Sequence, residues 1–255
     1  MTYCLAIRVD QGLVFASDSR TNAGVDQVST YSKMHVFDEG PDRAVCILSS
    51  GNLATTQAVM RRLRLDNDSG AKTSINQAKD LAQVAEFVGK LSRAEQRKHA
   101  SRSKTDKFNP EASFVVGGQV GKRPHQIYLV YPEGNYIAAT VQTPYLQIGE
   151  SKYGKPILDR IVNEDLSLEV AARCALVSMD STMRSNVTVG PPIELLIYAA
   201  GNAGFNRRLE FREDNPYLRE LRQAWHQGLK DAFERLPNLP VTRPAVQLVD
   251  ARSES

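Results

Sequence analysis

The chain has 255 residues, of which 42% are hydrophobic and 24% are charged, and its formal net charge is +3. This composition is typical of an ordinary globular protein, and so small a net charge gives no electrostatic basis for binding nucleic acid or an anionic membrane. No apolar run is long enough to cross a bilayer, and the N-terminus lacks the pattern of a signal peptide, so we expect a cytoplasmic protein.

The first fifty residues predict four short strands before any helix. Residues 3–9 and 13–17 form a pair around a tight turn, in which Gly12 supplies the positive φ that hairpins favour. Residues 33–37 and 44–49 form a second pair around the turn sequence DEGPDR. The chain therefore begins as a hairpin, which would hold its N-terminal residues in a sheet.

Two helices are predicted next. Residues 53–65 form the first, and Ser74 caps a longer second helix. The second helix carries a broad apolar face, made of Ile75, Ala78, Leu81, Ala82, Ala85, Phe87, Val88 and Leu91. It ends in the basic stretch SRAEQRKHASRSKTDK, which contains no aromatic residue and therefore favours a solvated helix end over a nucleic-acid patch.

The second half of the chain repeats the order of strands and then helices. Strands are predicted at 113–120, 126–131 and 136–140, and helices at 153–163 and 167–182, the latter capped by Ser167. Two last strands, 193–200 and 207–211, precede the final helix.

The final helix begins with Asp214 or Asn215 as its cap and Pro216 in its first turn. Its apolar residues recur at helical spacing, and they are Leu218, Leu221, Trp225, Leu229, Phe233 and Leu236. This face packs on its own domain or forms a contact between copies of the chain. We expect one domain over residues 1–240 and a C-terminal tail over 241–255.

The order of the elements predicts the fold class. No strand–helix–strand alternation is present, which argues against a parallel doubly wound sheet. Two antiparallel sheets faced by layers of helices fit the order, and we therefore expect an α+β fold.

Cysteine and histidine residues predict neither disulfides nor a metal site. Cys4, Cys46 and Cys174 are widely spaced and odd in number, which is typical of buried free thiols in a reducing compartment. The four histidines are scattered as well. We expect no metal and no cofactor.

Thr2 becomes the N-terminal residue if Met1 is removed. A terminal threonine carries a hydroxyl and a free α-amine, and an unperturbed α-amine titrates at about pH 8. One residue can therefore supply both a nucleophile and its general base. Such a site also needs a nearby cation that keeps the amine neutral, and a carboxylate that orients this cation.

Thr2 at the head of the first strand is followed by three informative segments, which are VFASDSR (14–20), TNAGVDQVSTYSK (21–33) and SSGNLAT (49–55). In this order they resemble the proteasome β-type subunits, a family of N-terminal-nucleophile threonine hydrolases. A weaker resemblance continues through SFVVGG, IYLVYPEGN and LQIGESKYGKPIL. The opening of the chain and the late segment MRSNVTVGPP are most similar to the bacterial ancestral type of β subunit, Anbu.

The resemblance implies a fold, an activity and four site residues. The fold is a four-layer α-β-β-α sandwich of two antiparallel sheets. Thr2 is the nucleophile, Asp18 and Lys33 occupy the family's acidic and lysine positions, and Gly51 occupies the oxyanion-binding position. The resemblance also implies a homo-oligomer, a ring or a helical assembly, that cleaves peptide or protein substrates. No unfoldase partner is identified from the sequence.

Two segments depart from the family pattern. The family has a serine after the glycine of a Gly-Ser-Gly turn, whereas this chain has Glu150 between Gly149 and Ser151. Glu150 either replaces that serine by bonding the terminal amine or is simply a loop charge. Residues 180–190 have no clear counterpart of the family's supporting Asp and Ser.

Three functions therefore remain in view. The first is a self-compartmentalising threonine peptidase. The second is an assembly protein of proteasome fold with a vestigial site, and the third is an amidase that acts on small peptides.

Overall fold

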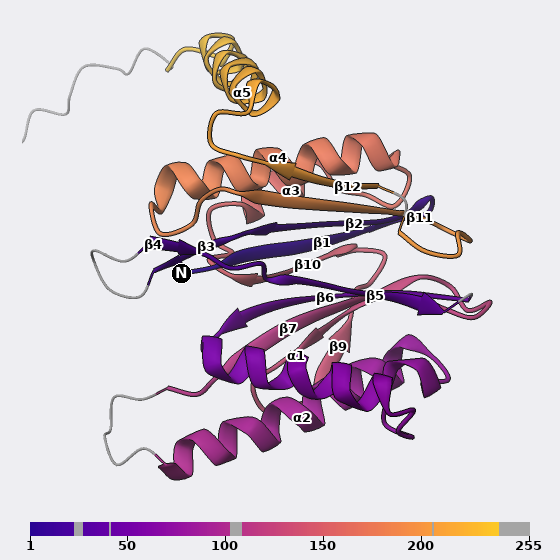
Figure 1. The fold of residues 1–255 in the computed structure, drawn as a ribbon. Coiled ribbons are helices and arrows are strands. Elements are labelled where there is room, and N and C mark those ends of the chain that lie inside the picture. The colour runs from indigo at the N-terminus through magenta and orange to yellow at the C-terminus, as the bar shows by residue number, and fades with distance from the viewer. Residues whose placement is uncertain (23–27, 41, 103–108, 206, 240–255) are drawn as a thin grey trace, which may run out of the picture.

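A computed structural model of the chain describes residues 1–22, 28–40, 42–102, 109–205 and 207–239. Two five-stranded antiparallel sheets stack face to face, and helices cover both outer faces (Figure 1). The molecule is thus the four-layer α-β-β-α sandwich that the family resemblance implies. Gly24 of the loop at 21–33 and the predicted tail lie outside the described residues.

The first sheet contains the N-terminal hairpin. Its strand order is β10-β1-β2-β11-β12, and every neighbouring pair is antiparallel. The strands are β1 (Tyr3–Val9), β2 (Gly12–Asp18), β10 (Tyr145–Gly149), β11 (Ile193–Ala199) and β12 (Arg207–Phe211). Because β1 and β2 lie in the middle of the sheet, the start of the chain is bonded on both sides.

The second sheet has the order β5-β6-β7-β8-β9 and is also antiparallel. Its strands are β5 (Met34–Gly40), β6 (Arg43–Gly51), β7 (Ala112–Val120), β8 (Gln126–Val130) and β9 (Tyr136–Ala138). A small separate hairpin of β3 (Arg20–Asn22) and β4 (Val28–Thr30) connects β2 of the first sheet to β5 of the second.

Helices form the outer layers. The second sheet is covered by α1 (Leu53–Asp68) and α2 (Leu81–Arg102), and the first sheet by α3 (Lys155–Ile161) and α4 (Leu168–Ser185) (Figure 1). A short 3-10 helix, η1 (Ile75–Gln77), precedes α2, and α5 (Pro216–Glu234) follows β12. None of the described helices is long and apolar enough to span a bilayer.

Three apolar cores fill the gaps between the four layers. One joins the first sheet to α3 and α4, one joins the second sheet to α1 and α2, and one lies between the sheets. Strand β1 supplies two of them, since Tyr3, Leu5 and Ile7 face the helices whereas Cys4 and Ala6 face the other sheet. All three cysteines are buried free thiols, as expected.

The predicted helix beginning at Ser74 is wrong in its first turn. Ser74 starts only η1, its hydroxyl forms no cap bond, and Ala78 after η1 is extended. Helix α2 begins at Leu81, where Asp80 accepts a hydrogen bond from the N–H of Gln83 at 2.9 Å. The hairpin β3–β4 and strand β10 are additional elements that the sequence patterns do not indicate.

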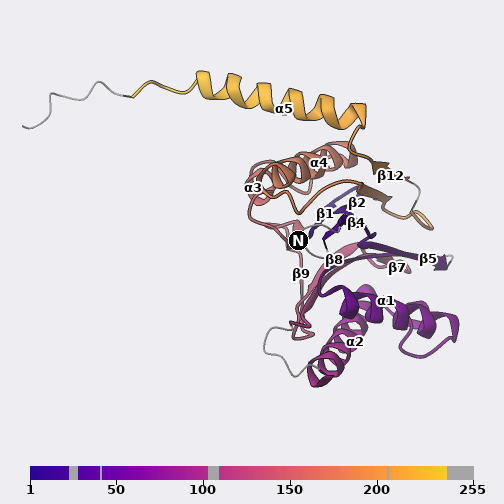
Figure 2. The same ribbon diagram turned by 60° about the vertical axis from the view of Figure 1, so that its left-hand side comes forward.

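The predicted caps of the last two long helices are confirmed. Ser167 accepts from the N–H of Val170 at 3.3 Å, and Asn215, followed by Pro216, accepts from the N–H of Leu218 at 3.3 Å. Helix α5 lies outside α4 and extends beyond the sandwich (Figure 2). Leu218 of this helix is buried, and Leu221 and Trp225 pack partly buried against the core, whereas Leu229 and Phe233 farther along the helix are exposed.

Candidate active site

Two hydrogen bonds hold the peptide group between Thr2 and Tyr3, one to the backbone of Glu150 and one to the side chain of Asp18. The carbonyl oxygen of Thr2 accepts the N–H of Glu150 at 2.7 Å. The next N–H, that of Tyr3, donates to Asp18 Oδ1 at 3.0 Å. Gly149, with φ +83°, allows this close approach, because a Cβ there would lie 1.9 Å from the Thr2 oxygen. Thr2 is therefore fixed at the end of the first sheet rather than frayed.

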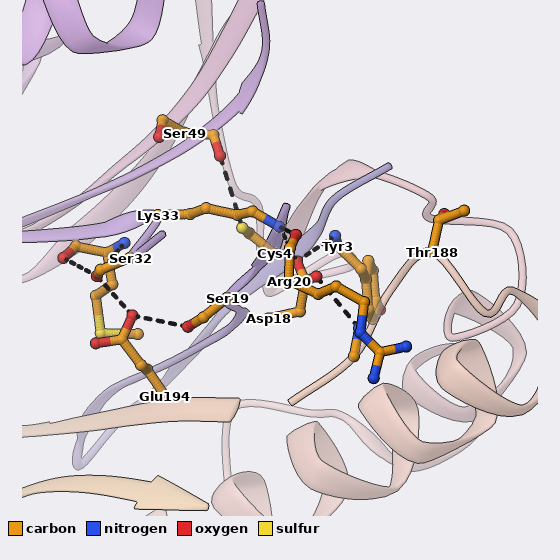
Figure 3. Close-up of polar contacts among 12 residues, drawn as sticks. Tyr3, Cys4, Asp18, Ser19, Arg20, Ser32, Lys33, Ser49, Thr188 and Glu194 are labelled. Atoms are coloured by element: carbon orange, nitrogen blue, oxygen red, sulfur yellow. Dashed lines mark hydrogen bonds and ion pairs between the residues drawn. The ribbon is translucent and has the colours of Figure 1, made fainter. Parts of the chain in front are cut away.

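Asp18 and Lys33 form a buried ion pair beside Thr2. The Lys33 Nζ lies 2.7 Å from Asp18 Oδ1, and the two side chains are 7% and 0% exposed. Lys33 also donates to the carbonyl oxygen of Arg20 at 2.8 Å. The other carboxylate oxygen of Asp18 accepts the N–H of Gly190 at 3.3 Å, so each oxygen has a donor (Figure 3). The ammonium group is thereby held in one place.

Burial is the largest influence on the pKa values of Asp18 and of the terminal amine. It raises the pKa of Asp18 above its usual range, although the Lys33 ammonium and the N–H donors oppose the shift. Burial also lowers the pKa of the Met1 α-amine, and the charge of Lys33 lowers it further. Asp18 and Glu150 act in the opposite direction on that amine. Lys33 thus favours a neutral amine at the N-terminus.

A cavity of about 240 Å³ opens at this end of the sandwich. Residues of both sheets and of their connections line it, and they are Met1, Thr2, Arg20, Thr21, Tyr31, Lys33, Ser49, Ser50, Gly51, Leu53 and Thr56. Three of the four predicted site residues, Thr2, Lys33 and Gly51, therefore share one cavity, and Asp18 lies behind Lys33. Gly51 has φ +108°, and a Cβ there would lie 2.3 Å from the carbonyl oxygen of Glu111.

Glu150 is buried, so it is not a solvent-exposed loop charge. It is 8% exposed, and its carboxylate accepts from Asn186 Nδ2 at 2.8 Å. Asn186 Oδ1 in turn accepts from the hydroxyl of Thr188 at 2.6 Å. The segment 180–190 thus contributes polar partners to Glu150, although the sequence shows no clear counterpart of the family's supporting residues there.

Several residues of the site escape the sequence patterns. The N–H of Gly190 and the carbonyl oxygen of Arg20 act through the backbone, which leaves no mark in side-chain type. The Asn186-x-Thr188 spacing is a local turn signal, but nothing in it indicates Glu150 as a partner. Within the described part of the chain, no group of three or more His, Cys, Asp or Glu side chains could hold a metal ion.

The arrangement supports nucleophilic chemistry at the N-terminus. A hydroxyl and an amine on one residue would lie beside a fixed ammonium group, in a cavity that Thr2, Lys33 and Gly51 line together. The charge of the ammonium would keep the amine in its basic form, and the buried carboxylate would hold the ammonium in place.

Comparisons with known proteins agree with this geometry. The profile of the family described as "Proteasome subunit" matches residues 2–198. Anbu, an ancestral β subunit, from Yersinia bercovieri is similar with a TM-score of 0.88 and 39% identity, over 94% of this chain and 100% of that one. For Anbu from Pseudomonas aeruginosa, described as a helical assembly, the values are 0.86 and 42%, over 94% and 99%. No curated protein matches the chain.

Proposed function

The chain belongs to the proteasome subunit family, and on this premise we propose that it is a threonine peptidase. Its nucleophile is Thr2, which becomes the N-terminal residue when Met1 is removed. The substrate is a peptide or an unfolded protein segment, and the bond cleaved is an amide. The three buried free thiols support a reducing compartment, the cytoplasm.

The reaction takes two steps. Thr2 Oγ attacks the carbonyl carbon of the substrate while its proton passes to the Thr2 α-amine, and the N–H of Gly51 stabilises the oxyanion. The C–N bond breaks, the α-amine returns the proton to the leaving amine, and an ester remains on Thr2. Water then attacks this ester with the same amine as base, which releases the carboxylic acid and the free hydroxyl.

Lys33 and Asp18 adjust the pKa of the Thr2 α-amine, the general base of both steps. The Lys33 ammonium disfavours a second positive charge on the α-amine, so the amine is neutral at a lower pH than an ordinary terminus. Glu150, which accepts a hydrogen bond from Asn186, acts against Lys33 and so limits how far the pKa of the α-amine is lowered. We assign Glu150 to the place of the family's serine, with the role of orienting the amine.

The buried Asp18–Lys33 pair is the observation that carries the proposal. Lysine and aspartate are seldom buried, and withdrawing the two charges from water costs several kcal/mol unless each has a full set of partners. Here Asp18 accepts from Lys33 and from two backbone N–H groups, and Lys33 donates also to the carbonyl oxygen of Arg20. Lys33 lines the cavity that contains Thr2. A pair that served only stability would have no reason to face the chain terminus.

Covalent labelling tests the proposal. We expect the intact mass of the purified protein to lack Met1, and a peptide epoxyketone to add one inhibitor mass that maps to Thr2. The epoxyketone requires both the hydroxyl and the free amine, so it reports on the proposed pair directly. Protein that retains Met1 is the matched control and should remain unlabelled. Labelling at another residue while Thr2 stays unmodified would refute the assignment.

A vestigial site is the second candidate, and the Glu150–Asn186 pair favours it. An acidic group close to the amine raises its pKa, which would slow a base that works near neutral pH. A chain without Met1 that assembles but takes up no epoxyketone would support this second function. A chain that is labelled but cleaves only dipeptides and tripeptides would instead be an amidase.

We also propose that the chain forms a homo-oligomer with Thr2 of each copy facing a shared interior. Anbu from Pseudomonas aeruginosa forms a helical assembly. In this chain Leu229 and Phe233 of α5, and Leu236 just after its end, are 50%, 74% and 59% exposed. Such an uncovered apolar row is typical of a protein interface. Sedimentation velocity at micromolar concentration should show a species well above a dimer, and a single 28.3 kDa species would contradict the proposal.

A further inference from the structure

Glu194 is a second buried carboxylate near the site, and it takes no part in the mechanism described above. It lies on β11, on the face that is turned toward the other sheet, and it is 6% exposed. Its Oε1 accepts from the guanidinium of Arg208 at 2.6 Å. Arg208 is half-exposed, so the carboxylate is shielded from water while its partner remains in contact with the solvent.

The other oxygen of Glu194 joins two segments that are distant in the sequence. Glu194 Oε2 accepts from the hydroxyl of Ser32 at 2.6 Å, a length typical of a charge-assisted bond, and from that of Ser19 at a longer 3.4 Å. The N–H of Tyr31 donates to the carbonyl oxygen of Ser19 at 2.8 Å, which ties the same two segments together through the backbone.

Ser19 and Ser32 are the immediate neighbours of the two charged site residues. Successive side chains of an extended segment point to opposite sides, so the two hydroxyls face one way while Asp18 and Lys33 face the other. Figure 3 shows this arrangement, with Glu194 on one side and the bond between Lys33 and Asp18 on the other.

We propose that Glu194 is a positioning residue. It fixes the separation of Asp18 and Lys33 by accepting hydrogen bonds from the hydroxyls of their neighbours, Ser19 and Ser32. The proposal rests on the function proposed above, since it concerns the same site. It explains why a carboxylate occupies a position at which an apolar side chain would fill the inter-sheet core without a desolvation cost.

A comparison with the neighbouring residue supports a specific role. Glu210 lies directly opposite Glu194 in the β11–β12 register, yet it is exposed and pairs only with Arg212 among the contacts described, at 3.0 Å. Glu194 and Glu210 are thus partners in the register of one strand pair, yet they differ in burial and in the residues that they contact. Only Glu194 reaches the segments that carry Asp18 and Lys33.

Other titratable groups around Glu194 do not change charge near neutral pH. Burial, with smaller contributions from Arg64 and Arg208, lowers the pKa of His35 to about 4. Burial raises the pKa of Cys4 and of Cys46 well above the usual range of a thiol. A pH profile between about 5 and 8 therefore reports on the terminal amine rather than on these neighbours.

The test compares Ser32→Ala and Glu194→Gln in the full chain without Met1. The first readout is the pKa of the Thr2 α-amine, obtained from the pH dependence of its trace acetylation by acetic anhydride. The second is the rate of epoxyketone addition. Both variants should raise the amine pKa toward its ordinary value of about 8, because Lys33 is no longer held beside it. Epoxyketone addition should slow by about tenfold or more.

Two variants serve as controls. Ser32→Thr keeps the hydroxyl and should retain the wild-type amine pKa, and Glu210→Gln makes the same chemical change outside the contact. Thermal unfolding is measured in parallel, since a merely structural role would lower the midpoint without moving the amine pKa. If Glu194→Gln does not fold, Ser32→Ala decides alone, because Ser32 lies outside the strands and is only half-buried.

An unchanged amine pKa in Ser32→Ala and in every folded Glu194→Gln preparation would overturn the positioning role. The function proposed above fails by a separate result, the absence of an epoxyketone adduct on Thr2 of the wild-type chain. In that case the acetylation profile still decides on Glu194, since it requires only the terminal amine.

Discussion

Thr2→Ala abolishes hydrolysis and leaves the fold and the assembly intact. We expect kcat/KM for a fluorogenic peptide to fall by about 10³-fold or more, because no other group can form the ester. The fold is preserved because the hydrogen bonds that hold this position run through the backbone, from the N–H of Glu150 to the Thr2 oxygen and from the N–H of Tyr3 to Asp18. Alanine keeps both.

Two further measurements complete this test. Thr2→Ser retains a primary hydroxyl and the terminal amine, so it should keep measurable hydrolysis and epoxyketone labelling. Sedimentation of Thr2→Ala should match that of the wild type. Hydrolysis by Thr2→Ala at a rate comparable to the wild type would show that the nucleophile lies elsewhere.

Lys33→Ala removes activity and also destabilises the protein. The change leaves Asp18, whose side chain is 0% exposed, as a buried carboxylate without its counter-ion. Breaking such a pair costs about 3–5 kcal/mol. Hydrolysis should fall by about 10²-fold or more, because the α-amine loses the charge that keeps it neutral. Denaturant unfolding and peptide hydrolysis measure the two effects separately.

The pH dependence of this destabilisation has a definite sign. Burial already raises the pKa of Asp18, and Lys33 opposes the shift, so the variant raises the pKa further. The loss of stability is therefore full at neutral pH and diminishes as the pH falls through the raised pKa, where Asp18 is protonated with or without Lys33. A loss that does not depend on pH would contradict this account.

A double variant separates stability from chemistry. Asp18→Asn combined with Lys33→Ala removes both charges, so most of the stability should return while hydrolysis remains lost. Lys155→Ala is the matched surface control. Lys155 pairs with Asp159 at 2.7 Å, but both side chains are about half-exposed, so its removal should cost at most about 1 kcal/mol. Recovery of activity in the double variant would exclude an electrostatic role of Lys33.

Much of the fold follows from signals that span only a few residues. Gly12 marks the β1–β2 turn, Ser167 and Asn215 mark the starts of α4 and α5, and each of these features is found where it is predicted. The start of α2 shows where such signals fail. Ser74 and Asp80 are both acceptable caps, and the choice between them depends on Ala78, which is extended as it packs against the core under α1.

The residues of the candidate site also fall into two groups, those that the sequence identifies and those that only the tertiary structure brings to the site. Thr2, Asp18, Lys33 and Gly51 can be named from the sequence because they occur in recognisable segments near the N-terminus, each of them within or beside a strand with a local pattern. Glu150, Gly190 and Glu194 come from distant parts of the chain. They reach the site only because β10 pairs with β1 and β11 pairs with β2. These pairings depend on the burial of whole apolar faces between the layers, a collective effect that no short segment encodes.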